Sequence, residues 1–237
     1  MGASKKKKRR IVIFTVEIIL LLAVLAFLFL WSKYQKLDTQ PDIIGTEDYI
    51  NTDMDETTKK VLQGYTNIAL FALDNRSNGN FDAGNSDVIM IASINNDTKE
   101  VKLVSVYRDT FLNVNDDGSM NFRKANYAYN KGGVEGAVKM LNRNMDLDIQ
   151  DYVVVDFQAV TEAIDLLGGV EVEIDAQEAK WMDFYINETA QVTEHEAHSI
   201  TQPGVYNLDG VQATSYCRIR YTAGDDFKRA QRQREVI

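Results

Sequence analysis

The amino-acid sequence predicts the α/β class: a single extracellular α/β domain, with a mixed sheet covered by helices, behind an N-terminal transmembrane helix. Strand-like apolar runs alternate with helix-like segments from residue 66 onward, which is typical of α/β architecture. One uninterrupted apolar run, residues 11–31, precedes them. A chain of 237 residues with 45% apolar and 26% charged side chains has room for one anchor and one such domain. This composition excludes a disordered chain, a collagen and a polytopic membrane protein.

The apolar run at residues 11–31 is predicted to be an uncleaved membrane anchor. Its length gives a helix of ~31 Å, about the hydrocarbon thickness of a bilayer. A removed secretory signal is the alternative, but such a signal has an apolar core of roughly 7–15 residues and a small-residue cleavage site. Basic flanks stay inside the cell, so residues 1–10 with their KKKKRR segment are predicted to be a cytoplasmic tail. A nucleic-acid-binding patch is the alternative explanation of this segment.

Charge is unevenly distributed along the chain. The first 37 residues hold eight Lys or Arg and one Glu, whereas the other 200 hold 18 Lys or Arg and 34 Asp or Glu. An acidic exterior domain is a poor partner for nucleic acid, so none is predicted. Residues 32–65 are polar and predict a stalk, and residues 66–237 form the predicted domain. Because the chain stops at Ile237 inside a predicted helix, we expect the domain to continue beyond it.

The elements of the outer domain follow from apolar periodicity. Near-continuous apolar runs, as in IALFAL and YVVVDF, predict strands buried on both faces, whereas the alternating VEVEI predicts a strand with one wet face. Apolar residues at helical spacing, with an acidic cap or a terminal Gly-Gly pair, predict helices. The predicted strands are residues 68–73, 88–94, 101–106, 152–157 and 170–174, and the predicted helices are residues 133–144, 158–167, 209–217 and 227–237 with Asp209 and Asp226 as caps.

The first of three polar clusters combines carboxylates with an arginine. Asp74 and Arg76 follow the first predicted strand, and Asp87 opens the second. Two carboxylates at strand ends can hold one Mg²⁺, a hard cation that shares its shell with water and substrate phosphates. The alternative is that both aspartates are ordinary turn residues.

The second cluster follows the third predicted strand. Arg108 and Asp109 come directly after that strand, and Lys124 follows a short loop later. Charged residues just beyond a buried strand are well placed to line a cleft. The alternative is a solvated sheet edge.

The third cluster is a group of basic residues near the carboxyl end. Arg218 and Arg220 come first, and a four-residue spacing then places Arg229 and Gln233 on one helix face, which Arg232 flanks. Arginine grips phosphate oxygens in pairs, which lysine cannot do. A solvated basic helix would use lysine as readily, but five of the six basic residues in this stretch are arginines. The cluster therefore predicts anion binding.

Seven motifs, in their order along residues 66–237 and behind an amino-terminal anchor, resemble the LytR-CpsA-Psr (LCP) family. The sequence departs from the family pattern at two positions. Asn85 stands where the family often has arginine, and Tyr107 stands where the family usually has a proline before the arginine of this motif. The motifs are Leu73-Asp74-Asn75-Arg76, Ser86-Asp87, Tyr107-Arg108-Asp109-Thr110, Lys124-Ala125-Asn126, Leu167-Gly168-Gly169-Val170, Arg218-Ile219-Arg220 and Gly224-Asp225-Asp226-Phe227-Lys228-Arg229-Ala230-Gln231-Arg232-Gln233.

The resemblance implies an extracytoplasmic phosphotransferase of Gram-positive-type envelopes. Such an enzyme transfers an anionic glycopolymer, of teichoic acid or capsular polysaccharide type, from a polyprenyl-pyrophosphate carrier to peptidoglycan. The implied partners are the lipid-linked glycopolymer, the peptidoglycan acceptor and the lipid bilayer. By correspondence, Asp74 and Asp87 would hold Mg²⁺ (or Mn²⁺). The expected pyrophosphate ligands are Arg76, Arg108, Arg218, Arg220, Arg229 and Gln233, to which the basic clusters add Lys124 and Arg232.

Charge explains why such a site needs arginines. The transition state of phosphoryl transfer spreads negative charge over the phosphate oxygens, which fixed guanidinium groups and a metal ion stabilise. Arg108 and Asp109 are the candidate catalytic residues, and positioning with electrostatics is favoured over general-base catalysis because arginine stays protonated. The lipid tail needs an apolar tunnel, with core packing as the alternative role of its candidate residues, which are Val134, Val138, Leu141, Ile164 and Leu167.

Two other functions stay open. The same site could hydrolyse the lipid pyrophosphate, with water as the acceptor. The chain could instead be a non-catalytic envelope sensor or transcriptional attenuator, although its ten cytoplasmic residues are too few for a DNA-binding fold. His195 and His198 lack the spacing of a metalloprotease motif and predict an exposed loop. The lone Cys217 excludes a disulfide scaffold and is expected to serve in packing.

Overall fold

The chain is described from a computed structural model. The described residues are 2–34, 51, 54–74, 81, 84–115, 119–222 and 224–237, without the side chains of residues 2–12, 30, 33, 34 and 225. The chain divides into two compact units, Met1–Ile43 and Ile44–Ile237.

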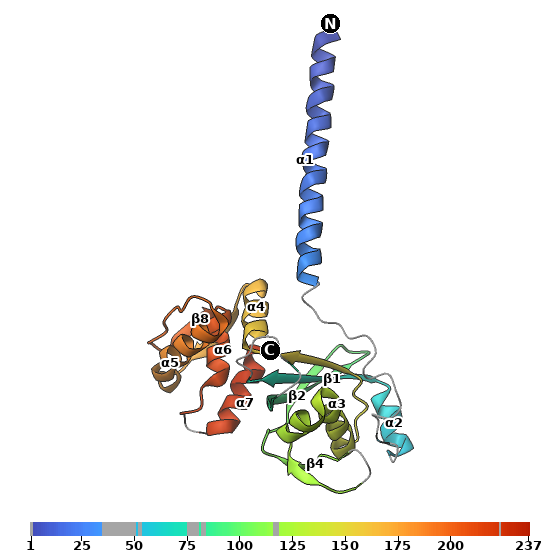
Figure 1. Ribbon diagram of the computed structural model, residues 1–237, viewed down its shortest axis with the longest axis vertical. Coiled ribbons are helices and arrows are strands. Elements are labelled where there is room, and N and C mark those ends of the chain that lie inside the picture. Colours follow the sequence, from blue (N-terminus) through green and yellow to red (C-terminus); the bar gives the residue numbers. More distant parts are fainter. Residues whose placement is uncertain are drawn as a thin grey trace. The chain divides into compact units, whose positions relative to one another are not determined.

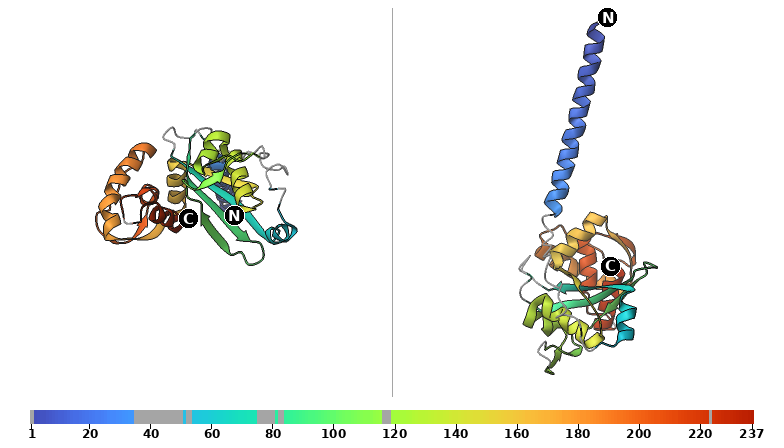
Figure 2. Two further views of the ribbon diagram at one scale, coloured as in Figure 1. Left: turned by 90° about the horizontal axis from the view of Figure 1, so that it is seen from below. Right: turned by 90° about the vertical axis from the view of Figure 1, so that its right-hand side faces the viewer.

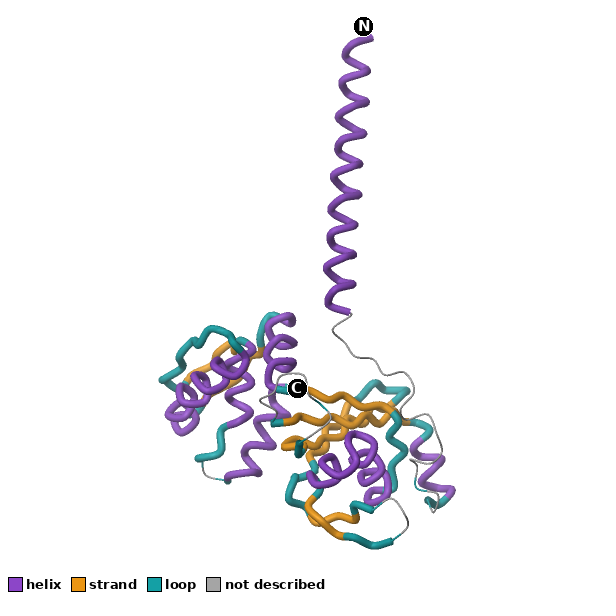
Figure 3. Tube along the Cα trace, in the orientation of Figure 1, coloured by secondary structure: helices purple, strands orange, loops and turns teal. Residues whose placement is uncertain are grey.

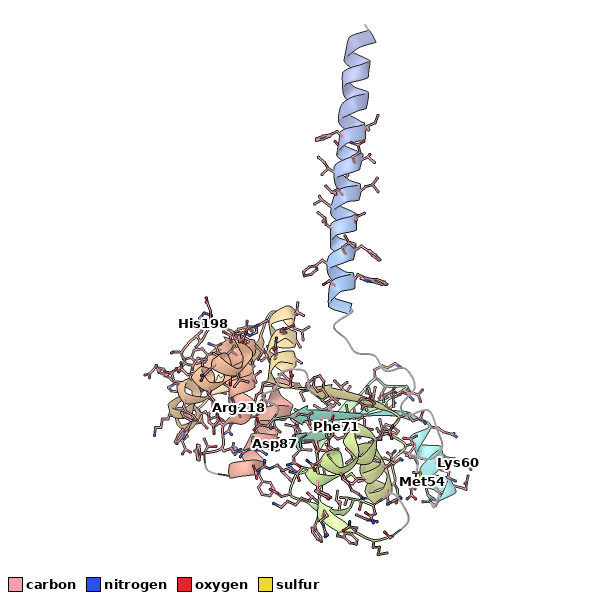
Figure 4. The ribbon with its side chains drawn as sticks, in the orientation of Figure 1. Met54, Lys60, Phe71, Asp87, His198 and Arg218 are labelled. Atoms are coloured by element: carbon pink, nitrogen blue, oxygen red, sulfur yellow. The ribbon has the colours of Figure 1, made fainter. Side chains whose placement is uncertain are left out.

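The first unit contains helix α1 (Gly2–Tyr34). Between Ile13 and Trp31 its large apolar side chains are exposed and project on all sides of the helix (Figure 4). Within the described part of the chain, no helix combines the length and the apolarity that crossing a membrane requires. The anchor predicted at residues 11–31, of which the side chains of 11, 12 and 30 lie outside the described part, stays a prediction.

The second unit contains the remaining helices and strands (Figures 1 and 3). Its helices are α2 (Glu56–Leu62), α3 (Asn126–Met145), α4 (Phe157–Leu167), α5 (Ala176–Thr193), α6 (Gly210–Arg218) and α7 (Asp225–Val236). Its strands are β1 (Tyr65–Leu73), β2 (Ser86–Asn95), β3 (Val101–Ser105), β4 (Phe111–Asn113), β5 (Phe122–Lys124), β6 (Asp151–Val155), β7 (Val170–Ile174) and β8 (Gly204–Leu208).

The main sheet has four strands in the order β3-β2-β1-β6. Strand β1 pairs antiparallel with β2 and parallel with β6, so the sheet is mixed, as the sequence predicts. Leu70 shows this central position, because it pairs with Met90 on one side and with Val153 on the other. One face of β1, which includes Phe71, is buried, whereas the residues of the other face are half-buried. The predicted strands are confirmed, but their burial on both faces is not, because β6 at the edge of the sheet has no buried residue.

The helices form two groups around this sheet. Helix α3 packs against β2 and against the hairpin of β4 and β5. Beyond the carboxyl end of β1, helices α4, α5 and α6 surround the β7–β8 hairpin, and α7 contacts α6 and β3 (Figures 1 and 2). This second group has its own apolar core, in which Ile174, Met182, Ile186 and Leu208 are almost fully buried. The space between the sheet and this group is where the site lies.

Local sequence signals set the ends of these helices. Asp156 caps α4, and its carboxylate accepts a hydrogen bond from the backbone N–H of Ala159 at 2.8 Å. Asp175 and Asp209 form capping boxes at the starts of α5 and α6. Helix α4 ends at Gly168, whose φ of 88° is a left-handed conformation that favours glycine. The Asp209 cap and the Gly-Gly helix end are confirmed.

The structure also corrects several predictions. Helix α3 begins at Asn126, and the helix predicted at residues 133–144 is its second part, after a kink with non-helical backbone at Gly132 and Gly133. Helix α7 is capped by Gly224, not by Asp226. Helices α2 and α5 and strands β4, β5 and β8 were not predicted.

The boundary of the folded unit also differs. Helix α2 and the buried Met54 lie inside the stretch predicted as a stalk, residues 32–65. The folded unit therefore begins before residue 66.

Candidate active site

A cavity of about 590 Å³ lies between the main sheet and helices α4 to α7. Much of its wall is apolar and comes from the carboxyl half of β1, from β6 and from α4, as at Leu70, Val153 and Val160. Asp87 and Arg218 belong to its polar part, and Figure 4 shows both between the sheet and the helices. A cavity of this kind suits a ligand with a charged head and a long apolar tail.

The two predicted carboxylates line the cavity from neighbouring strand ends. Asp74 follows β1 directly, and Asp87 is the second residue of β2. The pairing of β1 with β2 is regular up to Ala72 opposite Val88, and Leu73 then pairs with Ser86. Asp87 is therefore the extra residue of a β-bulge, a device that re-aims a side chain at the end of a ladder. The bulge explains how Asp87 joins Asp74 at the cavity.

Two arginines hold Asp87. Arg108 Nη1 donates to Asp87 Oδ1 at 2.7 Å, and Arg220 Nη2 lies 3.5 Å from Asp87 Oδ2. Burial lowers the pKa of Arg108, but the hydrogen bond and charge of Asp87, with the charges of Asp109 and Asp226, outweigh burial and leave that pKa raised. Arg108 therefore stays cationic.

Arg229 lies deep in the wall, with only 6% of its surface exposed. Its Nη2 is 3.2 Å from Asp226 Oδ1, whereas its buried Nε has no hydrogen-bond partner among the described residues. Burial, followed by the positive charge of Arg220, lowers the pKa of Arg229 despite the opposing charge of Asp226. A buried cation with a free donor and cationic neighbours favours an anionic ligand. Gln233, one turn further along α7, also lines the cavity.

Arg218 is held in place by residues of α5 and α4. Its Nη2 lies 2.9 Å from Glu188 Oε2, and its Nη1 donates to Thr189 Oγ1 at 2.8 Å. The guanidinium group also stacks on Phe157, with its carbon 4.4 Å from the ring centre. These contacts fix its orientation before any ligand binds. Glu188 and Phe157 were not predicted, because their contact with Arg218 depends on tertiary packing.

The structure gives no support to the prediction that Arg232 binds pyrophosphate. Arg232 is 2% exposed, and its Nε lies 2.7 Å from Glu178 Oε1. Its other two nitrogens donate to Ile219 O at 2.9 Å and to Thr222 Oγ1 at 2.5 Å. Every nitrogen of the guanidinium group thus has a partner, which leaves Arg232 a structural role beneath the site.

Asp109 and Lys124 form an ion pair with each other at 2.5 Å. The hydrogen bond from Lys124, opposed by slight burial and aided by the charges of Lys124 and Arg108, lowers the pKa of Asp109. Lys124 is exposed on β5, and the described lining of the cavity does not include it. Its predicted contact with pyrophosphate is therefore unsupported. Arg76, the remaining predicted ligand, lies outside the described residues.

The donor chemistry of Asp74 and Asp87 fits a hard divalent cation. No group of three or more His, Cys, Asp or Glu side chains that could hold a metal occurs within the described ranges. Two carboxylates suit Mg²⁺ or Mn²⁺, because such an ion takes the rest of its shell from water and substrate phosphates. Burial raises the pKa of the Cys217 thiol, which also lines the cavity, to about 12. This thiol is neutral at physiological pH and suits packing rather than metal binding.

The apolar residues proposed for a lipid tunnel separate in the structure. Ile164 lines the cavity, as predicted. Val138 and Leu141 are fully buried in α3, which packs against β2, and Leu167 is 84% exposed at the end of α4. Neither these three nor Val134 is among the described lining residues. Their helical spacing indicated an apolar face correctly, but it could not indicate which core that face meets.

His195 and His198 follow α5 in a stretch without regular structure, as predicted. His198 is exposed, and its Nδ1 lies 2.9 Å from the Oδ2 of Asp209.

Comparisons with known proteins agree with this fold. The model of the LytR_cpsA_psr family matches residues 32–237. The teichoic acid transferase TagU of Enterococcus faecalis is 28% identical over 99% of this chain and 70% of its own length. Biofilm regulatory protein A of Streptococcus mutans is 31% identical over 65% of this chain and 37% of its own length. The solved structure of TagT bound to LI-WTA is 26% identical, with a TM-score of 0.58 over 73% of this chain and 62% of that one.

Proposed function

Because the chain belongs to the LytR_cpsA_psr family, we propose that it is a membrane-anchored phosphotransferase of the cell envelope. It transfers an anionic glycopolymer, of teichoic acid or capsular polysaccharide type, from a polyprenyl-pyrophosphate carrier to peptidoglycan. The E. faecalis relative is named a polyisoprenyl-teichoic acid–peptidoglycan teichoic acid transferase, and TagT was solved bound to LI-WTA. Both names support a lipid-linked glycopolymer as the donor.

One observation carries the proposal: cations and carboxylates gather at one part of a cavity that is otherwise apolar. Arg218, Arg220 and Arg229 come from the far end of the chain, and they share the cavity with Asp74 and Asp87 from the early strands. A pyrophosphate with an isoprenoid tail has the matching division into a doubly anionic head and an apolar chain. Guanidinium groups fixed around such a head stabilise the charge that grows on its oxygens during transfer.

The transfer is a substitution at phosphorus. The oxygen of a peptidoglycan hydroxyl forms a bond to the phosphorus on the sugar side, and the bond from this phosphorus to the bridging oxygen breaks. The bridging oxygen keeps the electron pair and leaves as part of polyprenyl phosphate, while the hydroxyl proton passes to water. Net charge and atoms are thus conserved, and the product is a phosphodiester between glycopolymer and peptidoglycan.

Arg108 and Asp109 act by charge and position in this proposal. The raised pKa of Arg108 rules it out as a proton acceptor at neutral pH. The lowered pKa of Asp109 keeps it ionised but makes it a weak base. Arg108 instead holds Asp87 at 2.7 Å, and Asp109 is left to orient the attacking hydroxyl.

Asp74 and Asp87 are proposed to hold Mg²⁺ or Mn²⁺. When bound, the ion would neutralise charge on the pyrophosphate oxygens, as metal ions do in other phosphoryl-transfer enzymes. Arg108 and Arg220 keep Asp87 in place, since each approaches one of its carboxylate oxygens. Removal of either arginine would therefore also loosen the proposed metal ligand.

We propose that residues 11–31 anchor the chain in the cell membrane, with the amino terminus in the cytoplasm and the site outside. The uninterrupted apolar sequence and the basic residues before it support this topology. A membrane anchor would keep the site near the lipid-borne donor. A variant with the KKKKRR segment moved behind residue 31 should invert or fail to insert, which protease accessibility in whole cells would detect.

The test of the activity uses the full chain in lipid vesicles with a synthetic polyprenyl-pyrophosphate glycan, peptidoglycan and Mg²⁺. Asp87→Ala and Arg108→Ala should abolish transfer, whereas Arg123→Ala, an exposed arginine on β5, should not. Release of free glycan phosphate without peptidoglycan would instead identify a pyrophosphatase. If folded wild-type protein leaves the donor intact, both activities are contradicted. That result would favour a regulatory role, which the name of the S. mutans relative indicates for that protein.

A further inference from the structure

A second cavity of about 310 Å³ adjoins the first. Asp87, Val88, Arg229 and Gln233 line both cavities, so these residues form the wall between them. The second cavity has a different character, because its other lining residues come mainly from the loop after β3 and from α7, with one residue each from β2 and β3. It opens beside the site, but β6 and α4, which supply much of the apolar wall of the first cavity, contribute no residue to its described lining.

Two exposed aromatic rings stand at this second cavity. Tyr107 is 37% exposed and Phe227 is 70% exposed, and their ring centres are 4.8 Å apart in an edge-to-face arrangement. Both line the cavity. Rigid aromatic side chains offer apolar area at low entropic cost, and the C–H face of a pyranose ring packs well against such surfaces. An exposed aromatic pair beside polar groups is therefore suited to a sugar.

Polar groups for a sugar's hydroxyls lie beside these rings. The carboxylates of Asp109 and Asp226 are half-exposed and line the cavity as hydrogen-bond acceptors. The Nε atoms of Arg108 and Arg229, also residues of this cavity, are buried without a hydrogen-bond partner among the described residues. Unsatisfied buried donors are costly, so a ligand oxygen that reaches them gains binding energy. The cavity thus offers both an aromatic surface for the sugar ring and polar groups for its hydroxyls.

The direction of the reaction decides which sugar this cavity receives. In phosphoryl transfer the attacking and leaving oxygens lie roughly in line, on opposite sides of the phosphorus. The leaving polyprenyl phosphate belongs to the first, apolar cavity, and the phosphorus lies at the shared wall, where Arg229 lines both cavities. The attacking hydroxyl must then approach from the side of the second cavity. This step rests on the proposed function.

We propose that the second cavity, with Tyr107 and Phe227 as its platform and Asp109 and Asp226 as its hydrogen-bond acceptors, is the subsite for the acceptor sugar of peptidoglycan. It places the attacking hydroxyl against the shared wall at Arg229 and Asp87. The donor's own sugar is the other source of a pyranose ring near this wall, and kinetics separates the two.

The test measures transfer by the full chain in vesicles while the donor and a soluble, uncrosslinked peptidoglycan oligomer are varied independently. Phe227→Ala and Tyr107→Ala should each raise KM for the oligomer by about tenfold, as the loss of one aromatic contact allows, and leave KM for the donor unchanged. Phe227→Trp should retain the low KM. The matched control is Phe111→Ala, which removes one ring of an exposed aromatic pair on the β4–β5 hairpin.

Each other outcome is decisive. A raised KM for the donor with an unchanged KM for the oligomer would overturn the acceptor assignment, because the cavity would then hold the donor's sugar. Unchanged values for both substrates would overturn the subsite itself. Calorimetric binding of the oligomer without donor separates this proposal from the proposed function. If wild-type protein transfers nothing, the subsite stands when the oligomer binds and Phe227→Ala weakens that binding, and it falls when the wild type does not bind.

Discussion

The buried pair of Arg232 and Glu178 allows a sharp prediction about stability. Arg232→Met keeps an apolar stem of similar length but leaves the carboxylate of Glu178, which is 5% exposed, without its cation. Breaking one partner of a buried ion pair costs about 3–5 kcal/mol, because the other charge is left uncompensated. For a domain of this size each kcal/mol lowers Tm by about 2–4 °C, so we expect Tm to fall by roughly 6–20 °C.

Thermal unfolding of the purified full chain, followed by circular dichroism, measures this effect. Arg232→Met combined with Glu178→Gln should recover most of the loss, since a glutamine can still accept the hydrogen bond from the Asp175 backbone that closes the capping box. Arg229→Met is the matched variant on the same helix. It should cost little stability, because its ion-pair partner Asp226 is half-exposed, and should instead weaken donor binding.

A small change in Tm for Arg232→Met, together with weaker donor binding, would refute this reasoning. That result would return Arg232 to the group of pyrophosphate ligands. Failure of the double variant to recover stability would show that the uncompensated charge of Glu178 is not the source of the loss.

Three further predictions concern the site, the pH dependence and the packing. Arg108→Lys keeps the charge but loses the planar fork that reaches Asp87, so kcat for transfer should fall about 10²–10³-fold. The hydrogen bond and charge of Asp209 raise the pKa of His198 above its usual value of 6.5. The stabilisation from this contact is therefore complete below pH 6.5 and is lost as the pH rises through the folded-state pKa. In urea unfolding at several pH values, His198→Gln should remove this dependence. Gly210→Ala should cost about 1–3 kcal/mol in the same unfolding assay, because its Cβ would collide with a backbone carbonyl of α4.

Controls and contrary results are specific to each variant. Full transfer by the Arg108→Lys enzyme would show that charge alone suffices. An unchanged slope of stability with pH in His198→Gln would remove the role of the Asp209 contact. Gly132→Ala is the control for Gly210→Ala, because a Cβ at Gly132 would meet nothing within 4 Å. Equal costs for the two glycine variants would contradict the packing argument.

The sequence predicts those features that local patterns encode. The apolar run of β1 predicted a strand, and the Asp209 cap and the Gly168 helix end predicted helix boundaries, all of which the structure confirms. These signals act within a few residues, so they can be recognised without knowledge of the fold. The predicted helix began at Gly133, so the part of α3 before the kink at Gly132 and Gly133 was missed.

Partners that are distant in sequence could not be predicted. Arg229 and Arg232 are three residues apart on one helix, yet Arg229 lines the cavity and Arg232 meets Glu178, 54 residues earlier in the chain. Helical spacing alone cannot decide between these positions, because both residues lie near the same side. The ion pair of Lys124 with Asp109 could not be predicted either, because the β4–β5 hairpin brings the two residues together. The convergence of Asp74 and Asp87 with the late arginines was predicted only through the family resemblance.

The bulge at Asp87 makes chain length as important as side-chain chemistry at this position. Asp87 has no opposite residue on β1, so deleting it would join Ser86 directly to Val88. The ladder would then be uninterrupted, with Ser86 opposite Leu73 and Val88 opposite Ala72. Such a deletion would straighten the strand and erase the carboxylate in one event, while every remaining backbone pairing could persist. We expect such a shortened chain to fold and, from the proposed role of Asp87, to be inactive.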